Sequence, residues 1–128
     1  MSSSKHYEFT ISVNTTFLVD QSDELQGRYV FAYTILIVNS GTVAAQLISR
    51  HWLITDAEGM VQEVKGLGVV GEQPLLQPGE SYEYTSGTVM STPAGYMRGS
   101  YHVVAEDGTT FEAEIPIFNL SVPNRVIH

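Results

Sequence analysis

The sequence contains no cysteine among its 128 residues. This absence excludes disulfide bonds, thiolate metal sites and cysteine nucleophiles. It also excludes the buried disulfide that joins the two sheets of antibody domains. The absence of cysteine suits a protein of a reducing compartment, where disulfide bonds are rare.

Basic residues are also scarce, at six against 14 acidic ones, which gives a net charge of −8. They are scattered along the chain: Lys5, Arg28, Arg50, Lys65, Arg98 and Arg125. No basic stripe is present to follow a phosphate backbone, so the sequence argues against nucleic-acid binding. The acidic balance favours solubility and would attract cations or basic protein surfaces.

Long hydrophobic runs are missing as well. The N-terminal residues 1–6 lack the apolar segment of a signal peptide. The longest apolar stretch, Tyr29 to Val38, is too short to cross a bilayer. We therefore expect a soluble, cytoplasmic protein with no membrane contact. Its length predicts a single domain over residues 1–128, with residues 1–6 as a disordered tail.

No window shows the apolar periodicity of a helix, whereas period-two alternation is frequent. Residues 9–19, for example, place Phe9, Ile11 and Phe17 on one face. Turn signals separate further strands, predicted at 28–38 (central), 44–55, 60–65, 81–89, 97–105 and 111–118. The pattern predicts an all-β, immunoglobulin-like or fibronectin type III-like sandwich of about seven to eight strands. The predicted core contains Phe9, Phe17, Phe31 or Tyr33, Ile35, Tyr101, Phe111 and Ile115.

Two motifs compete in the segment between residues 66 and 82. Gly66, Gly68 and Gly71 spell G-x-G-x-x-G, which binds dinucleotides when it joins a strand to a helix. Prolines 74 and 78 deny it that helix, so we interpret the glycines as a bent strand and turn, although weak pyrophosphate affinity stays open. The second motif predicts a structural corner in which the Tyr82 phenol bonds back to upstream backbone; its residues are Leu76, Pro78, Gly79 and Tyr82.

Four stretches of the chain coincide in one further pattern: residues 49–56, 66–87, 92–101 and 111–118. Together they resemble the ApaG family of small bacterial proteins, and the resemblance covers nearly the whole chain. It implies a fibronectin type III-like or immunoglobulin-like sandwich. It also implies a domain that recurs in eukaryotic proteins known for their partners, an F-box protein and a polymerase-delta-interacting protein. The family has been linked genetically to cobalt resistance and magnesium efflux, and no catalytic residues come with it.

The polar residues select no catalytic or metal site. His51 and Trp52 are adjacent on a strand and must face opposite sides, and a metal site would need His51 to meet His102 across the sheets. We interpret the carboxylates, among them Glu112 and Glu114, as a solvated face. We therefore predict no enzyme activity, no metal and no cofactor.

The leading hypothesis is a non-enzymatic interaction module that binds an unidentified protein, or a second copy of itself, through a strand edge. The predicted edges are the strand that contains Pro116 and the segment 66–70. Apolar residues near them are Leu67, Val69, Val70, Leu75, Tyr96 and Phe118, unless these only cover the end of the sandwich. The candidate binding residues are Gly66, Gly68, Val69, Val70, Gly71, Glu72 and Gln73. The alternative is a soluble accessory that binds divalent cations or pyrophosphate through the glycine-rich loop.

Overall fold

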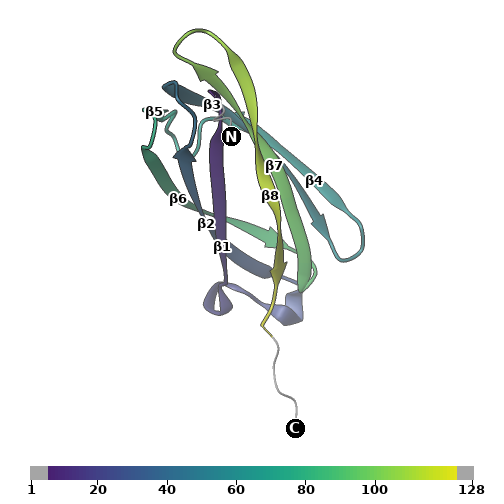
Figure 1. Cartoon of the computed structure of the whole chain (residues 1–128). Helices are drawn as coiled ribbons and strands as arrows, with labels where there is room; N and C mark the ends of the chain where they lie inside the picture. Colours follow the sequence, from purple (N-terminus) through teal and green to yellow (C-terminus); the bar gives the residue numbers. More distant parts are fainter. Residues whose placement is uncertain (1–5, 124–128) are drawn as a thin grey trace, which may run out of the picture.

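The computed structural model describes residues 6–123, which form two antiparallel sheets packed face to face (Figure 1). The first sheet has the order β1-β2-β6, with β1 at Phe9–Phe17, β2 at Tyr29–Asn39 and β6 at Ser81–Met90. The second has the order β4-β3-β7-β8: β3 spans Ala45–Asp56, β4 Val61–Leu67, β7 Ala94–Ala105 and β8 Thr110–Ser121. The short strand β5, Leu75–Leu76, also pairs with β3. The predicted all-β sandwich is confirmed.

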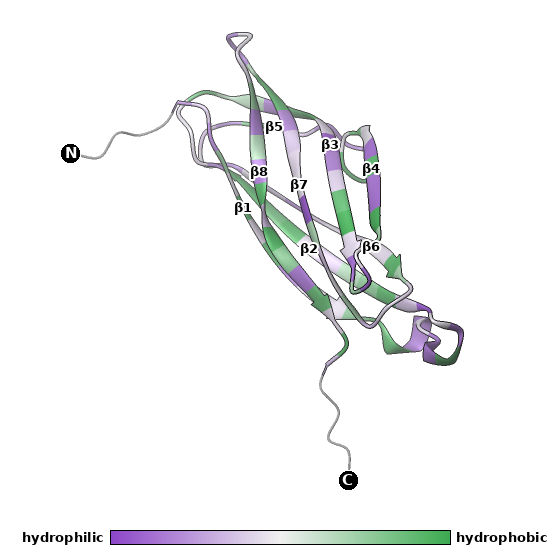
Figure 2. Cartoon of the chain, turned by 90° about the vertical axis from the view of Figure 1, so that its right-hand side faces the viewer, coloured by the Kyte–Doolittle hydropathy of each residue, from purple (hydrophilic) through white to green (hydrophobic). Residues whose placement is uncertain are grey.

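The predicted strand pattern agrees with the structure in its main elements. Strand β2 lies between β1 and β6, as its high apolar content predicted. Apolar and polar residues alternate along several strands, so one face of each sheet is core and the other is solvated (Figure 2). The polar connection after β1 forms two short 3-10 turns, Val19–Gln21 and Glu24–Gln26.

The core lies between the two sheets and is rich in aromatic rings. Most of the predicted members are buried: Phe9, Phe31, Tyr33, Ile35, Tyr101 and Ile115. Phe17 and Phe111 are only half-buried and pack against the rim of this core. At its centre, the Trp52 ring contacts Tyr33 and Tyr101, with ring centroids 5.5 and 6.4 Å apart.

A β-bulge decides which face of β3 carries Trp52. The ladder between β3 and β7 shifts register between Leu47 and Ser49. Before the bulge, the side chains at odd-numbered positions face the core, as at Leu47. After it, those at even-numbered positions do, as at Trp52 and Ile54. A bulge inserts one unpaired residue and so reverses the alternation. Trp52 is therefore 2% exposed, and the neighbouring His51 lies on the solvated face.

Strands β4 and β8 are the two edges of the larger sheet, which confirms the predicted edge at Pro116. Of the predicted edge segment 66–70, Gly66 and Leu67 lie on β4, and the remaining residues form a turn. Strands β4 and β8 lie at opposite ends of that sheet, so the apolar residues predicted near the two edges do not form one surface. Strand β8 runs beside β1, whereas β4 and β6 lie on the other side of the sandwich (Figure 2). Pro116 lies on β8, where a missing N–H donor is tolerated.

The predicted tail at residues 1–6 falls almost entirely outside the described residues. His6 is described, and its Nδ1 lies 2.7 Å from the hydroxyl of Thr42, so this residue belongs to the folded domain. None of the described helical segments is long and apolar enough to cross a membrane.

Candidate functional site

The glycine–proline loop, residues 66–79, begins as the end of β4 and continues into a tight turn. The Val69 and Glu72 backbones exchange two hydrogen bonds, of 2.8 and 2.9 Å. The Gly68 amide donates to the Ile48 carbonyl at 2.8 Å. The interpretation as a bent strand and turn is confirmed, because β4 ends at Leu67 and the element that follows Gly71 is the short strand β5. Three amides that would line an anion nest, those of Gly68, Val69 and Glu72, are thus bonded within the protein.

Val70 occupies a strained backbone conformation at the tip of this turn. Its φ is +42°, and that of Gly71 is +83°, so both central residues have the positive φ of a type I′ turn. Glycine, asparagine and aspartate usually fill such positions, because a β-branched side chain crowds the backbone there. Strain of this kind costs about 1–3 kcal/mol and tends to occur at functional sites.

Arg50 anchors the loop from the neighbouring strand. Its Nη1 donates to the carbonyls of Leu67 and Gly68, at 3.0 and 2.9 Å. Gly66 lies opposite Arg50 in the ladder, and a Cβ there would come within 2.7 Å of the guanidinium. Gly68 has φ +65°, and a Cβ on it would lie 2.3 Å from the Glu72 carbonyl oxygen. Gly68 is therefore required by close packing against backbone, whereas a side chain at position 66 would displace the Arg50 guanidinium.

The second half of the loop is fixed by two amide side chains. Gln73 Nε2 donates to the carbonyl of Ile48 at 2.9 Å, beside the β-bulge. Gln46 Nε2 donates to the carbonyl of Gln73 at 3.0 Å. The loop is therefore held on β3 by side chains on both of its flanks.

Three apolar side chains on this rigid support are exposed: Leu67 (75%), Val70 (55%) and Leu75 (56%). We call them the loop patch. Leu67 and Leu75 pair with Ser49 and Gln46 of β3, on the solvated face of the sheet.

Three of the other predicted contact residues do not belong to the patch. Val69 is fully buried, which corrects its prediction as a binding residue. Tyr96 pairs with Thr55, near the far end of β3 from Leu67, and Phe118 packs against the core. Glu72 and Gln73 are exposed beside the patch.

The predicted corner forms, but a different residue anchors it. Leu76 is buried, and Gly79 takes φ +86° after Pro78. Within residues 6–123 the Tyr82 hydroxyl has no hydrogen-bond partner, so the expected tyrosine-corner bond is not formed there. The buried Asn39 holds the corner instead, since its Nδ2 donates to the carbonyls of Leu76 and Val43 at 2.9 and 3.0 Å.

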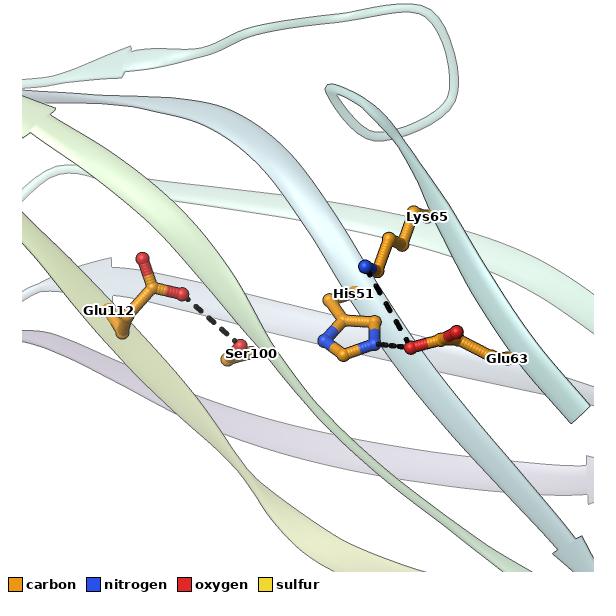
Figure 3. A network of polar contacts seen from close by, with 5 residues as sticks. All are labelled: His51, Glu63, Lys65, Ser100 and Glu112. Atoms are coloured by element: carbon orange, nitrogen blue, oxygen red, sulfur yellow. Dashed lines mark hydrogen bonds and ion pairs between the residues drawn. The ribbon is translucent and has the colours of Figure 1, made fainter. Parts of the chain in front are cut away.

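Histidine and carboxylate side chains meet on the solvated face of the larger sheet (Figure 3). His51 Nε2 lies 2.6 Å from Glu63, and this contact lowers the pKa of the Glu63 carboxyl group. His102 Nδ1 lies 2.5 Å from Glu112. Both histidines are on adjacent strands of one sheet, so they do not meet across the sheets as a shared metal site would have required. Across residues 6–123, no group of three or more His, Asp or Glu side chains is placed to hold a metal ion.

Comparisons with known proteins agree with this fold. The family model described as "ApaG domain" matches residues 19–105. The chain is 66% identical to Protein ApaG of Thiobacillus denitrificans and 65% identical to Protein ApaG of Nitrosospira multiformis, each over the full length of both chains. The crystal structure of the putative ApaA protein from Bordetella pertussis superposes with a TM-score of 0.93 at 55% identity, covering 96% of this chain and all of that one. The chain therefore belongs to the ApaG family.

Proposed function

We propose that this chain is a non-enzymatic interaction module that binds a protein partner through the loop patch. The observation that carries the proposal is the exposure of Leu67, Val70 and Leu75 on a loop that is rigidly anchored and strained. Exposed apolar side chains that gather on one surface usually mark a binding site. A preformed surface binds with a smaller loss of conformational entropy than a mobile loop does.

The partner would meet apolar contacts surrounded by polar groups. Glu72 and Gln73 border the patch, and the edge of β4 continues from it. An unpaired edge can accept an added strand, so main-chain hydrogen bonds would add to the apolar contacts. The same edge would serve a homodimer, in which the partner is a second copy of the chain.

Site-specific photo-crosslinking tests this proposal. A photoreactive side chain would replace Leu67 or Leu75, and Ile117 serves as the control because it is also exposed (65%) but lies on β8. We expect the same crosslinked species from positions 67 and 75 and not from position 117. A product of twice the chain mass would identify the homodimer. Equal crosslinking from all three positions would contradict a specific site.

The alternative function, cation or pyrophosphate binding by the loop, has less support. The loop presents the carbonyls of Leu67 and Gly68 to Arg50 and uses three of its amides internally. Amide NMR spectra recorded against magnesium, cobalt and pyrophosphate separate the two functions. Saturable changes in amide chemical shift confined to residues 66–73 would favour the alternative. Such changes with magnesium or cobalt would support the cation-related role that the family resemblance implies.

A further inference from the structure

The edge strands β4 and β6 lie on the same side of the sandwich (Figure 2). Residues of both strands line a cleft there. We call it the inter-sheet cleft; its volume is about 580 Å³. Both sheets line it, with contributions that include Arg28, Tyr33, Arg50, Trp52, Gln62 and Ser86. Small-molecule sites typically occupy about 300–1,000 Å³ and combine apolar walls with a few polar groups.

The charge of this cleft is opposite to that of the protein as a whole. The chain has 14 acidic and six basic residues, yet the described residues that line the cleft include two arginines and no carboxylate. In the part of the chain that the structure describes, neither Arg28 nor Arg50 forms an ion pair. The acidic Asp56 lines the adjoining hollow, where its Oδ1 accepts the amides of Glu58 and Met60. The cleft is thus a local positive region in an acidic protein.

Arg50 has hydrogen-bonding capacity that the fold does not use. Only its Nη1 is engaged, by the Leu67 and Gly68 carbonyls, and its Nε and Nη2 have no partner within residues 6–123. Its charge reaches between the sheets: burial raises the pKa of Tyr33, and Arg50 opposes that rise. A guanidinium with free N–H groups can bind a carboxylate or a phosphate through paired hydrogen bonds.

An aromatic pair lies at the base of the cleft, whose apolar lining also includes Ile54, Val64 and Val89. The rings of Tyr33 and Trp52 meet edge to face with centroids 5.5 Å apart. Both are nearly buried, at 6% and 2% exposed, so they form a fixed floor. Ser86 and Gln62 add polar groups to the walls.

We propose that the inter-sheet cleft binds a small organic anion. Arg28 and Arg50 meet its carboxylate or phosphate group, and its apolar part lies on the Tyr33–Trp52 floor. This site is separate from the loop patch, and it does not depend on the proposed protein partner. Arg50 contacts both regions, since it lines the cleft and also holds the loop.

Trp52 is the single tryptophan of the chain, so its fluorescence reports on the cleft directly. The full chain would be titrated with benzoate, phenyl phosphate, inorganic phosphate and neutral benzamide. We expect a saturable change with benzoate or phenyl phosphate, and the stronger response identifies the preferred group. No saturable response to either organic anion at millimolar concentrations would overturn the proposal, as would equal binding of benzamide or a response to inorganic phosphate alone.

Two matched variants localise the binding. Arg28→Gln should weaken it about tenfold or more, because a charged hydrogen-bonding partner is lost. Arg98→Gln removes the same charge from β7, where Arg98 lines a different hollow, so this variant should bind the anion as the parent does. Arg28 is exposed, and within residues 6–123 its side chain makes only one polar contact, a long one of 3.4 Å to the Gln21 carbonyl, so Arg28→Gln should fold normally. Equal affinity in both variants would contradict the assigned site.

Discussion

The hydroxyl groups of Tyr84 and Tyr101 lie 2.5 Å apart and join the two sheets in the middle of the core. Tyr84 belongs to β6 and Tyr101 to β7. Burial raises the pKa of both phenols, so both keep their protons at neutral pH and one must donate to the other. Removing one hydroxyl therefore leaves the other buried without its partner.

This relationship predicts an unusual order of stabilities. Tyr84→Phe should lower the free energy of unfolding by about 1–3 kcal/mol, because the Tyr101 hydroxyl loses its partner. The double variant Tyr84→Phe, Tyr101→Phe removes both polar groups and should be no less stable than the single variant. Urea unfolding of the parent, the single variants Tyr84→Phe and Tyr101→Phe, and the double variant measures the difference. A double variant that loses the sum of the two single losses would show that the hydroxyls are not coupled.

Asn39 should be the most important polar residue for the corner. Its side chain bonds three backbone groups, the carbonyls of Val43 and Leu76 and the amide of Gly41. Asn39→Ala leaves these groups without that partner near the core, so we expect a loss of at least about 2 kcal/mol in unfolding free energy. The matched control is Asn14→Ala on an exposed position of β1. Equal losses in the two variants would contradict the anchoring role.

The contact between His51 and Glu63 should make stability depend on pH in the acidic range. It lowers the pKa of Glu63 below its ordinary value of 4.5. A depressed carboxyl pKa stabilises the fold above the ordinary value, and this stabilisation is lost as pH falls through the folded-state pKa. At pH 6 the parent should thus have a higher free energy of unfolding than Glu63→Gln. This difference should shrink as the pH falls below 4.5. Urea midpoints across that range measure it, and a constant difference would contradict the prediction.

Local alternation predicted the strands, because each strand buries one face and its period of two is visible in the sequence. Trp52 shows where that rule fails. Its orientation depends on a bulge after Leu47, and apolar residues on both parities of β3 concealed the change of face. Val69 was misplaced for a related reason: in a turn the alternation ends, so an apolar residue can point into the core beside an exposed Val70.

The anchors of the loop and the corner could not be predicted from local patterns. Asn39 and Leu76 are 37 residues apart, and Arg50 reaches Gly68 across a strand pair. These contacts depend on register, which the sequence does not reveal without the partner strand. The motif around Pro78 and Gly79 did predict the corner, because those residue types restrict the backbone locally.

Val70→Asn provides the most direct test of the proposed function. Asparagine tolerates positive φ, so the variant should be more stable than the parent by about 1 kcal/mol. It also removes an apolar contact from the loop patch, so it should retain several-fold less of the protein that crosslinks from position 67. Ile117→Asn, with the same change on β8, should retain that protein fully. The decisive measurement is the fraction of this partner retained by folded Val70→Asn relative to the parent. A clear loss with stability kept or raised is the result we predict, and full retention would contradict the loop patch as the binding site.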